Sequence, residues 1–218
     1  MDFIDKNIQQ YAESHTSKEP EHLYNLNRYT HTNVMLPRML SGHLQGRFLA
    51  FLSCLIKPQY ILDIGTYTGY SALCLAEGLV NDNSKVISLE VNDEVALIAQ
   101  QFIEKSPYNQ KIKVMIGDAL MSINDANKMV PHWDIVWIDA EKMEYAAYYE
   151  SCIEKVRKGG IILADNVLWS GKVVDTKAQI EDDETKVIHQ FNNMVQNDKR
   201  VKNILLPIRD GIMAIEKL

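Results

Sequence analysis

Four residues that can bind metals or move protons lie at the ends of two apolar runs. "WIDAEK" ends with Asp139 and Lys142, and "ILADN" ends with Asp165 and Asn166. If these runs are adjacent parallel strands, the three oxygen-bearing side chains converge on one crevice. Carboxylates and an amide carbonyl are hard ligands that suit Mg²⁺, Mn²⁺ or Ca²⁺ and do not suit zinc. The pattern predicts a divalent-cation site at Asp139, Asp165 and Asn166.

Lys142 follows Asp139 by three residues, close enough to share that crevice. An ammonium beside a divalent cation is disfavoured, so we expect the pKa of Lys142 to fall and the amine to accept a proton from a substrate hydroxyl. Simpler alternatives remain. Lys142 can be a solvated surface residue, Asp139 can cap the helix beginning near Tyr145, and Asp165 with Asn166 can form an Asx turn.

A second chemical feature is "DIGTYTGYS", residues 63–71, which reads as a strand, a glycine turn and a helix. The spacing of Gly65 and Gly69 differs from G-x-G-x-x-G, so it does not predict a pyrophosphate cradle. Asp63 ends the strand and can accept hydrogen bonds, while Glu90 ends the next strand and can bind ribose hydroxyls. Together these features favour an adenosine-type ligand such as S-adenosylmethionine, although a plain turn and a capping aspartate would also fit.

"GDAL", residues 117–120, follows the third predicted strand. Asp118 or the adjacent amide can meet an adenine edge. Asp118 fits equally well as the N-cap of the next helix.

Short apolar runs alternate with helical patterns after Pro58, and several are apolar on both faces, as in parallel strands covered by helices. The runs are "YILDI", "KVISLE", "KIKVMIG", "WDIVWID" and "GGIILAD". The pattern predicts a doubly wound α/β sheet. "VKNILLPI" and "GIMAIEKL", separated by the turn-like "RDG", predict a terminal antiparallel hairpin. Three helices precede the first strand, and residues 167–180 read as an irregular stretch.

Length and composition describe one soluble domain spanning residues 1–218. The net charge of -6 argues against a broad nucleic-acid surface. The N-terminal sequence has no signal-peptide pattern and no long apolar run, so we expect a cytoplasmic protein with no membrane partner. The three cysteines are expected to be buried hydrophobes. No G-x-S-x-G elbow is present, which excludes a serine hydrolase.

At these residues the chain resembles the cation-dependent catechol and caffeoyl-coenzyme A O-methyltransferases. The likeness runs from about Met39 to the C-terminus. It is carried by "MLSGHLQGRFL", "LDIGTYTGYSALCLAEGL", "GDAL", "WIDAEK", "YYESCIEKVRKGGIILADNVLWSGKV" and "LLPIRDGIMAIEKL". The resemblance implies a Rossmann-like class I methyltransferase fold with a mostly parallel, seven-stranded sheet and extra N-terminal helices. It also implies a homodimer, with residues 1–57 forming the substrate mouth and contributing dimer contacts.

The resemblance also implies roles for individual residues. Asp139, Asp165 and Asn166 match the metal ligands, and Lys142 matches the general base. The positions that match the cofactor site are Met39, Asp63, Gly65, Tyr67, Ser71, Glu90, Asp118, Ala119 and Asp139. The positions that match the acceptor side are Lys142, Asn166, Trp169 and Arg209.

Three positions depart from the family pattern. Glu141 replaces an aspartate at a position not assigned to the metal, Arg209 stands where glycine is common, and Gln45 stands where the plant branch has glutamate. The expected reaction is divalent-cation-dependent methyl transfer from S-adenosylmethionine to one hydroxyl of a catechol. Two rivals are a nicotinamide-dependent dehydrogenase, which would need the missing third glycine, and a non-catalytic adenosine-binding protein.

Overall fold

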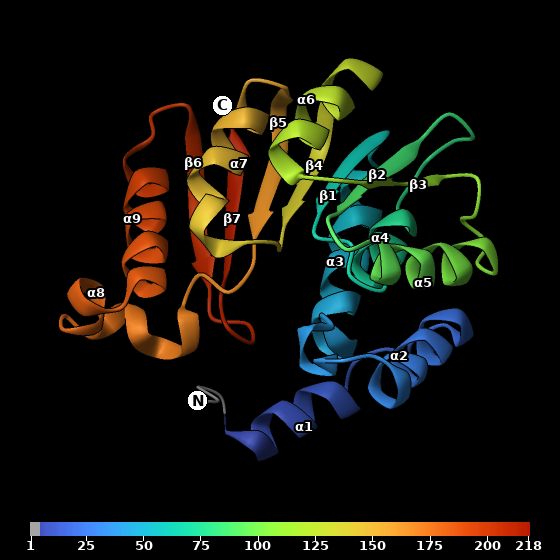
Figure 1. Cartoon of the computed structure of the whole chain (residues 1–218), viewed down its shortest axis with the longest axis horizontal. Coiled ribbons are helices and arrows are strands. Elements are labelled where there is room, and N and C mark those ends of the chain that lie inside the picture. Colours follow the sequence, from blue (N-terminus) through green and yellow to red (C-terminus); the bar gives the residue numbers. More distant parts are fainter. Residues whose placement is uncertain (1–4) are drawn as a thin grey trace.

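Seven strands form a single sheet in the computed structural model, which describes residues 5–218 (Figure 1). The strands are β1 (Tyr60–Ile64), β2 (Lys85–Glu90), β3 (Ile112–Ile116), β4 (Trp133–Ile138), β5 (Val156–Ala164), β6 (Val201–Leu206) and β7 (Ile212–Lys217). Their order is β3-β2-β1-β4-β5-β7-β6. Strands β1 to β5 pair in parallel, and β7 pairs antiparallel with both β5 and β6. The predicted doubly wound sheet and C-terminal hairpin are confirmed.

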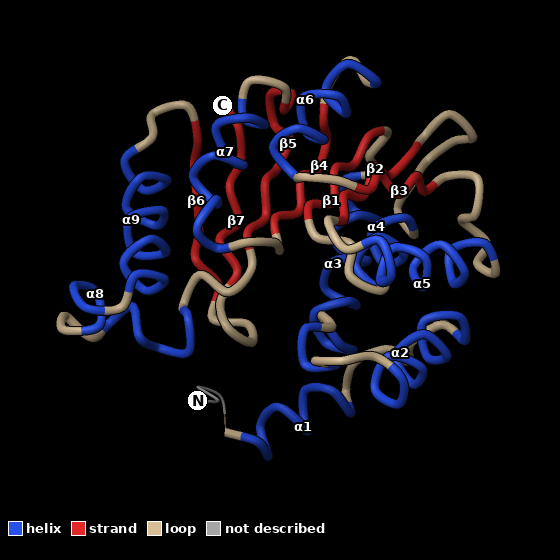
Figure 2. Tube along the Cα trace, in the orientation of Figure 1, coloured by secondary structure: helices blue, strands red, loops and turns tan. Residues whose placement is uncertain are grey.

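Helices cover both faces of this sheet (Figure 2). The α-helices are α1 (Lys6–Ser14), α2 (Glu21–Asn33), α3 (Gly42–Ile56), α4 (Tyr70–Ala76), α5 (Asp93–Glu104), α6 (Ala119–Met129), α7 (Tyr145–Ile153), α8 (Ala178–Glu181) and α9 (Asp183–Asn197). Three 3₁₀ turns are η1 (Pro37–Met39), η2 (Lys142–Glu144) and η3 (Trp169–Val174). As predicted, three α-helices precede β1.

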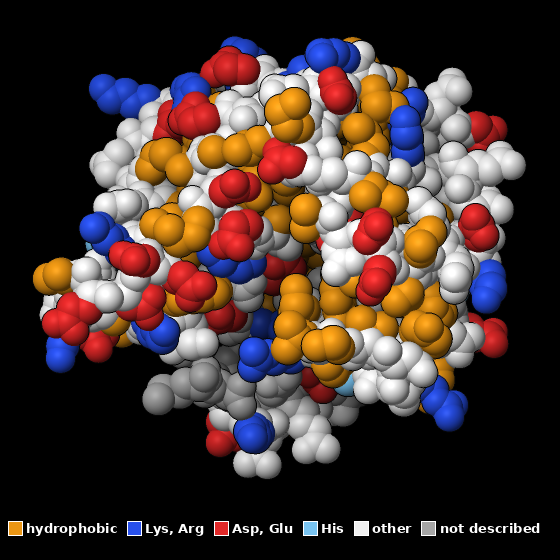
Figure 3. Space-filling model, in the orientation of Figure 1, with side chains coloured by type: hydrophobic (Ala, Val, Ile, Leu, Met, Phe, Trp, Pro, Cys, Tyr) orange, Lys and Arg blue, Asp and Glu red, His pale blue; other side chains and the backbone are white. Residues whose placement is uncertain are grey.

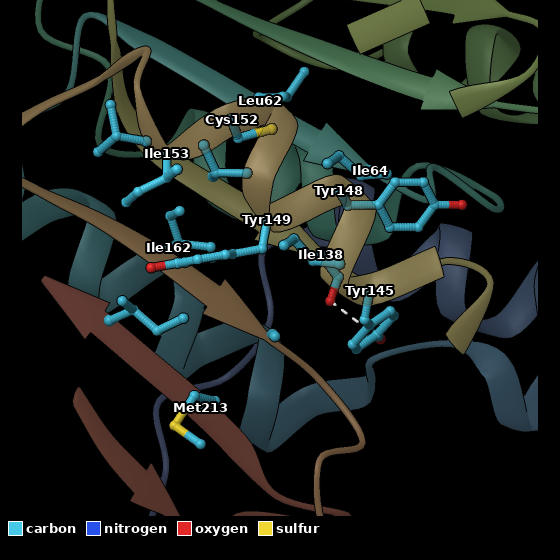
Figure 4. Packing of buried hydrophobic residues seen from close by; sticks show 14 of the residues in the cluster. Leu62, Ile64, Ile138, Tyr145, Tyr148, Tyr149, Cys152, Ile153, Ile162 and Met213 are labelled. Atoms are coloured by element: carbon cyan, nitrogen blue, oxygen red, sulfur yellow. Dashed lines mark hydrogen bonds between the residues drawn. The ribbon is translucent and has the colours of Figure 1, made fainter. Parts of the chain in front are cut away.

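Two hydrophobic clusters form because successive strand residues point to opposite faces. In β4, Val136 and Ile138 join a cluster with α6, α7 and α9, whereas Ile135 and Trp137 join a cluster with α2, α3, α4 and α5. Figure 4 shows tyrosines of α7 packed over the first of these faces, with the Tyr145 hydroxyl bonded to the backbone oxygen of Ile138. The sheet is therefore buried on both sides, and its carboxyl edge stays open for chemistry.

Some expectations need correction. Cys74 and Cys152 are buried as predicted, but Cys54 is exposed because it lies on the outer face of α3. Residues 167–180 are not simply irregular, since they contain η3 and the start of α8. η3 is kinked where Ser170 and Gly171 adopt positive φ angles of 53° and 75°.

Within residues 5–218, one helical stretch, Pro37–Ile56, has the length and apolar composition of a membrane span. It consists of η1 and α3, and α3 buries Gln45, Gly46 and Leu49 within the fold. This helix is therefore a partly buried element of the domain.

Candidate functional site

The carboxyl ends of the parallel strands bring four predicted site residues into one row. Ile64 pairs with Leu89 and Ile138, and Ile138 pairs with Ala164, so the residue after each strand continues the register. The ladder extends past the strands, because the backbone N–H of Gly65 donates to Leu89, that of Asp139 to Ile64 and that of Asp165 to Ile138. Neighbouring strands lie about 4.8 Å apart. Glu90, Gly65, Asp139 and Asp165 therefore lie side by side.

Gly65 occupies the middle of this row and must lack a side chain. Its φ is +105°, and a Cβ atom there would lie 2.0 Å from the backbone oxygen of Asp139. The glycine thus lets the turn after β1 pack against the end of β4. It also leaves a gap between the carboxylates of Glu90 and Asp139, which stand two strand spacings apart, or roughly 10 Å.

Glu90 is fixed by backbone donors on both sides. Its Oε2 accepts from the N–H of Tyr67 at 2.7 Å, and its Oε1 accepts from Val91 and Asn92 at 3.1 and 3.0 Å. Each carboxylate oxygen offers about two acceptor sites, so Oε2 keeps one for a ligand hydroxyl. The Tyr67 hydroxyl donates to the backbone oxygen of Met35 at 2.9 Å, which ties the turn to the segment before η1.

Asp63 and Ser71 form a buried support beneath the glycine turn. Asp63 is fully buried and accepts from the Ser71 hydroxyl at 3.1 Å and from the Ser88 hydroxyl at 2.5 Å. Burial raises the pKa of Asp63 to about 7, against the opposite effect of the two serine bonds. Ser71 lines the cleft, whereas Asp63 lies below its lining. Asp63 caps no helix, since Gly69 is the N-cap of α4.

The remaining predicted cofactor residues line the same cleft from other elements. Met39 lies in η1 and is 55% exposed. Asp118 is the N-cap of α6, with Oδ1 accepting from the N–H of Met121 at 2.9 Å, and Ala119 is the first residue of that helix. The capping interpretation of Asp118 is confirmed, and the residue still lines the cleft.

Asp139 and Lys142 form a partly buried ion pair. The Lys142 ammonium donates to Asp139 Oδ1 at 3.0 Å and to the Tyr145 hydroxyl at 2.8 Å. The Tyr145 hydroxyl in turn donates to the backbone oxygen of Asp165 at 3.1 Å. Asp139 does not cap the helix that begins at Tyr145, because the N-cap of α7 is Glu144 and that of the preceding η2 is Glu141. Lys142 is not a solvated surface residue, since only 14% of its side chain is exposed.

The expected fall in the pKa of Lys142 depends on a cation beside it, and the chain's own groups act in the opposite direction. Burial lowers the pKa of Lys142, but Tyr145 and Asp139 raise it by more, so the net direction is upward. The chain's own groups therefore keep the ammonium protonated. The predicted fall in the pKa would require an additional positive charge beside these residues.

Asp165 is buried at the end of β5. Its Oδ2 accepts from Gln45 Nε2 at 2.7 Å, and its Oδ1 accepts from the N–H of Asn166 at 2.8 Å. No Asx turn forms, because the N–H of Val167 donates to Gly211 instead. Burial and the nearby Asp139 raise the pKa of Asp165. Asn166 has a positive φ of 57°, and its side-chain amide makes no hydrogen bond within residues 5–218.

Trp169 and Arg209, predicted for the acceptor, line the same cleft. Trp169 begins η3 with φ at 46° and packs against the cluster under α7. Arg209 lies in the β6–β7 turn with φ at 51°, a conformation that favours the glycine common at this position. Its guanidinium donates to Gln45 Oε1 at 2.9 Å and to the backbone oxygens of Leu40 and Ser41.

One cleft of about 1100 Å³ joins all these parts. Glu90 and Tyr67 line one end, and Lys142, Asn166 and Arg209 line the other. Residues of α1 also line it, so the N-terminal helix forms part of the mouth. Figure 3 shows the cleft as a hollow near the centre of the view, with acidic and basic side chains around it. Its volume exceeds that of a typical site for one small ligand, so it has room for two reactants.

The donors near Lys142 fit a hard divalent cation. Two carboxylates directly follow the adjacent strands β4 and β5, and an amide with no partner in the described chain lines the same cleft. Within residues 5–218 no group of three or more His, Cys, Asp or Glu side chains is arranged to hold a metal. The proposed ligands include only two acidic residues, Asp139 and Asp165, because the third donor is the amide of Asn166.

Three contributing residues were not assigned to the site from sequence. Ser88 pairs with Asp63 across β1 and β2, so strand register could have found it. Tyr145 follows Lys142 by three residues, and that helical spacing was a usable signal. Gln45 lies 120 residues from Asp165, and no local pattern joins the two.

Comparisons with known proteins agree with this geometry. The O-methyltransferase family matches residues 13–218. A Dictyostelium discoideum protein named "Probable caffeoyl-CoA O-methyltransferase 2" is 33% identical over 97% of this chain and 91% of its own. The mouse "Catechol O-methyltransferase domain-containing protein 1" is 32% identical over 98% of this chain and 81% of its own. The crystal structure of an O-methyltransferase from Bacillus cereus in complex with SAH has a TM-score of 0.87, 29% identity and 97% coverage of both chains.

The strand order with its antiparallel hairpin, matched by the Bacillus cereus enzyme, defines a class I methyltransferase fold. The chain belongs to the O-methyltransferase family and has caffeoyl-CoA and catechol O-methyltransferase-like relatives. It is an S-adenosylmethionine-dependent O-methyltransferase. The dehydrogenase and the non-catalytic protein are thereby set aside.

Proposed function

We propose that the protein methylates one hydroxyl of a catechol-type acceptor, and that the reaction depends on a divalent cation such as Mg²⁺, Mn²⁺ or Ca²⁺. The observation that carries the proposal is the adjacency of Asp139 and Asp165, with Lys142 held 3.0 Å from Asp139. Two carboxylates beside a buried lysine, with an amide that is unpaired within residues 5–218, suit a cation that chelates two neighbouring acceptor oxygens.

At the cofactor end, Glu90 accepts a ribose hydroxyl of S-adenosylmethionine at its remaining Oε2 site. Gly65, Tyr67 and Ser71 surround the methionine portion, and Met39 lies near the methyl group. Asp118 and Ala119 adjoin the adenine. Asp63 acts by holding Ser71 from below, and Asp139 borders both reactants.

At the acceptor end, Asp139, Asp165 and Asn166 would hold the cation. When bound, the cation supplies Lewis-acid polarisation of the acceptor oxygens and a template for both. Lys142 would take the proton from the reacting hydroxyl as a neutral amine, a state that the positive charge of the cation favours. Tyr145 and Asp139 hold the lysine amine at 2.8 and 3.0 Å, so its direction is fixed before the acceptor binds. Trp169 and Arg209 line the acceptor pocket.

Alignment of two reactants is the main contribution of such a site, since the sulfonium already carries the electrophilic carbon. Proximity and orientation are worth roughly 7 to 11 kcal/mol in well-aligned systems. The row across the strand ends supports this role, because the ribose-binding and cation-binding carboxylates are separated by a glycine without side chain.

The test is a panel of acceptors incubated with labelled S-adenosylmethionine, in Mg²⁺ and in excess chelator. Catechols should be methylated only with the cation, and matched phenols with a single hydroxyl should not be methylated. Equal turnover in chelator, or equal use of phenol and catechol, would disprove the proposal.

The wider organisation belongs to the same proposal. Residues 1–218 act as one catalytic domain in the cytoplasm, with no nucleic-acid or membrane partner. Residues 1–57 frame the acceptor entrance and contribute to a homodimer, for which the exposed Phe51 and Leu55 of α3 are suitable contacts. Light scattering on purified protein tests the dimer.

A further inference from the structure

Gln45 connects the cation-binding end of the cleft to the β6–β7 turn. Its side chain is fully buried in α3. Gln45 Nε2 donates to Asp165 Oδ2 at 2.7 Å, and Gln45 Oε1 accepts from Arg209 Nη1 at 2.9 Å. Residues from three distant parts of the chain therefore form one hydrogen-bonded line.

The direction of this line is fixed by the chemistry of its ends. A guanidinium only donates hydrogen bonds, and an ionised carboxylate only accepts them. The amide oxygen of Gln45 must therefore face Arg209, and its NH₂ group must face Asp165. Without Arg209 the amide could rotate and present an oxygen to the carboxylate.

Arg209 is itself anchored to the start of α3. Its Nη1 also donates to the backbone oxygens of Leu40 and Ser41, which directly precede the helix that carries Gln45. The guanidinium thus fixes both the helix entry and the amide. Two positions that depart from the family pattern, 45 and 209, meet at this hydrogen bond.

The intervening amide matters for charge. A guanidinium bonded directly to Asp165 would neutralise the carboxylate as a cation ligand, whereas an amide donor leaves its charge intact. Gln45 on Oδ2 and the Asn166 N–H on Oδ1 each occupy one acceptor site. One site on each oxygen remains for the cleft.

We propose that Gln45 and Arg209 are positioning residues, which orient the Asp165 carboxylate for cation binding. The hydrogen bond to Gln45 carries the positioning effect of Arg209. This inference rests on the proposed cation dependence. Removal of a group that holds a metal ligand in place typically weakens metal affinity by about 10- to 100-fold, and we expect an effect of this size here.

The experiment measures Mg²⁺ binding by calorimetry in wild type, Gln45→Met, Arg209→Gly and the double variant. Gln45→Met should weaken binding about 10- to 100-fold. Arg209→Gly should weaken it less, and should fold normally because glycine suits the φ of 51° there. In the Gln45→Met background, Arg209→Gly should add nothing, since both act on one path.

Matched controls are Gln59→Met, at the amino end of β1, and Lys57→Gly, at another left-handed position with φ 53°. Neither should change Mg²⁺ binding, and S-adenosylmethionine affinity and thermal stability should stay level across all variants. Unchanged Mg²⁺ affinity in Gln45→Met, additive effects in the double variant, or parallel loss of stability would overturn the inference. If Asp165→Ala binds Mg²⁺ like wild type, the proposed function itself fails, and the inference with it.

Discussion

The end of the cleft proposed for the cofactor (the cofactor end) and the end proposed for the cation (the cation end) are held together in different ways. At the end proposed for the cofactor, Glu90 is bonded by backbone N–H groups within 23 residues of it. Asp63 is bonded by Ser71 of the same strand–turn–helix unit and by Ser88 of the neighbouring strand β2. At the cation end, Asp165 depends on Gln45, 120 residues away, and through it on Arg209. Backbone hydrogen bonds form whenever the local strand–turn–helix unit folds, whatever its side chains are. Long-range side-chain hydrogen bonds form only if the right residue types stand at both positions.

This difference suits the separate tasks that we propose for the two ends. The methyl donor stays the same whichever acceptor is used, and a rigid local unit is suited to bind it. The acceptor end is assembled from α3, η2, β5 and the β6–β7 turn, so single substitutions there can change selectivity without disturbing the cofactor unit. Variants at one end should therefore leave the other end's binding unchanged.

Asp165→Ala should have the largest effect. It removes a buried carboxylate that the row of strand ends brings beside Asp139. Methyl transfer should fall to the level of wild type in excess chelator, and S-adenosylmethionine affinity should stay unchanged. Radiolabel transfer and calorimetry check this. Activity that survives in both variant and chelator would remove the cation from the mechanism.

Lys142→Ala should rank second. A positioned general base typically contributes about 10² to 10⁴ in rate, so turnover should fall within that range at unchanged cofactor affinity. Tyr145→Phe keeps the lysine and removes one of its two hydrogen-bond partners, so its loss should be smaller. Steady-state kinetics with a catechol measures both. Wild-type turnover in Lys142→Ala across the pH range would exclude the lysine as base.

The sequence predicted the strands that carry the proposed cofactor residues, because the pattern there is local. The apolar runs predicted β1 and β2 with their observed bounds, and strand ends directly located Glu90 and Gly65. The structure changed the meaning of Gly65, whose missing Cβ is required by Asp139 rather than by a ligand. A local sequence pattern cannot predict this contact, because Gly65 and Asp139 follow different strands.

The cation end could be predicted only in part, because some of its contacts join residues that are far apart in the sequence. Adjacent strand ends predicted that Asp139 and Asp165 would converge, and register confirms it. The charge of Lys142 was not readable, because its pKa depends on burial and on Tyr145. The bonds of Gln45 depend on the fold bringing α3 beside Asp165 and Arg209, which periodicity cannot specify.

Glu90→Ala should produce a moderate loss confined to the cofactor. A hydrogen bond to a charged group is worth about 1.5 to 3 kcal/mol, which corresponds to roughly 10- to 100-fold in dissociation constant. Glu90→Gln should lose less, since the amide oxygen can still accept from a hydroxyl. Calorimetry with S-adenosylmethionine and with Mg²⁺ separates the ends. An unaltered cofactor constant would refute the ribose assignment.

Asp63→Asn should have the smallest effect, on the pH dependence of stability. Burial raises the pKa of Asp63 from its ordinary 3.8 to about 7 in the folded protein. Between these values the folded state binds more protons than the unfolded state, so this group makes the free energy of unfolding decrease as pH rises. Asparagine cannot titrate, so the stability of the variant relative to wild type should increase between about pH 4 and about pH 7, as measured by denaturant unfolding. A constant difference between the two proteins would mean that Asp63 stays ionised, with Ser71 and Ser88 fully compensating its burial.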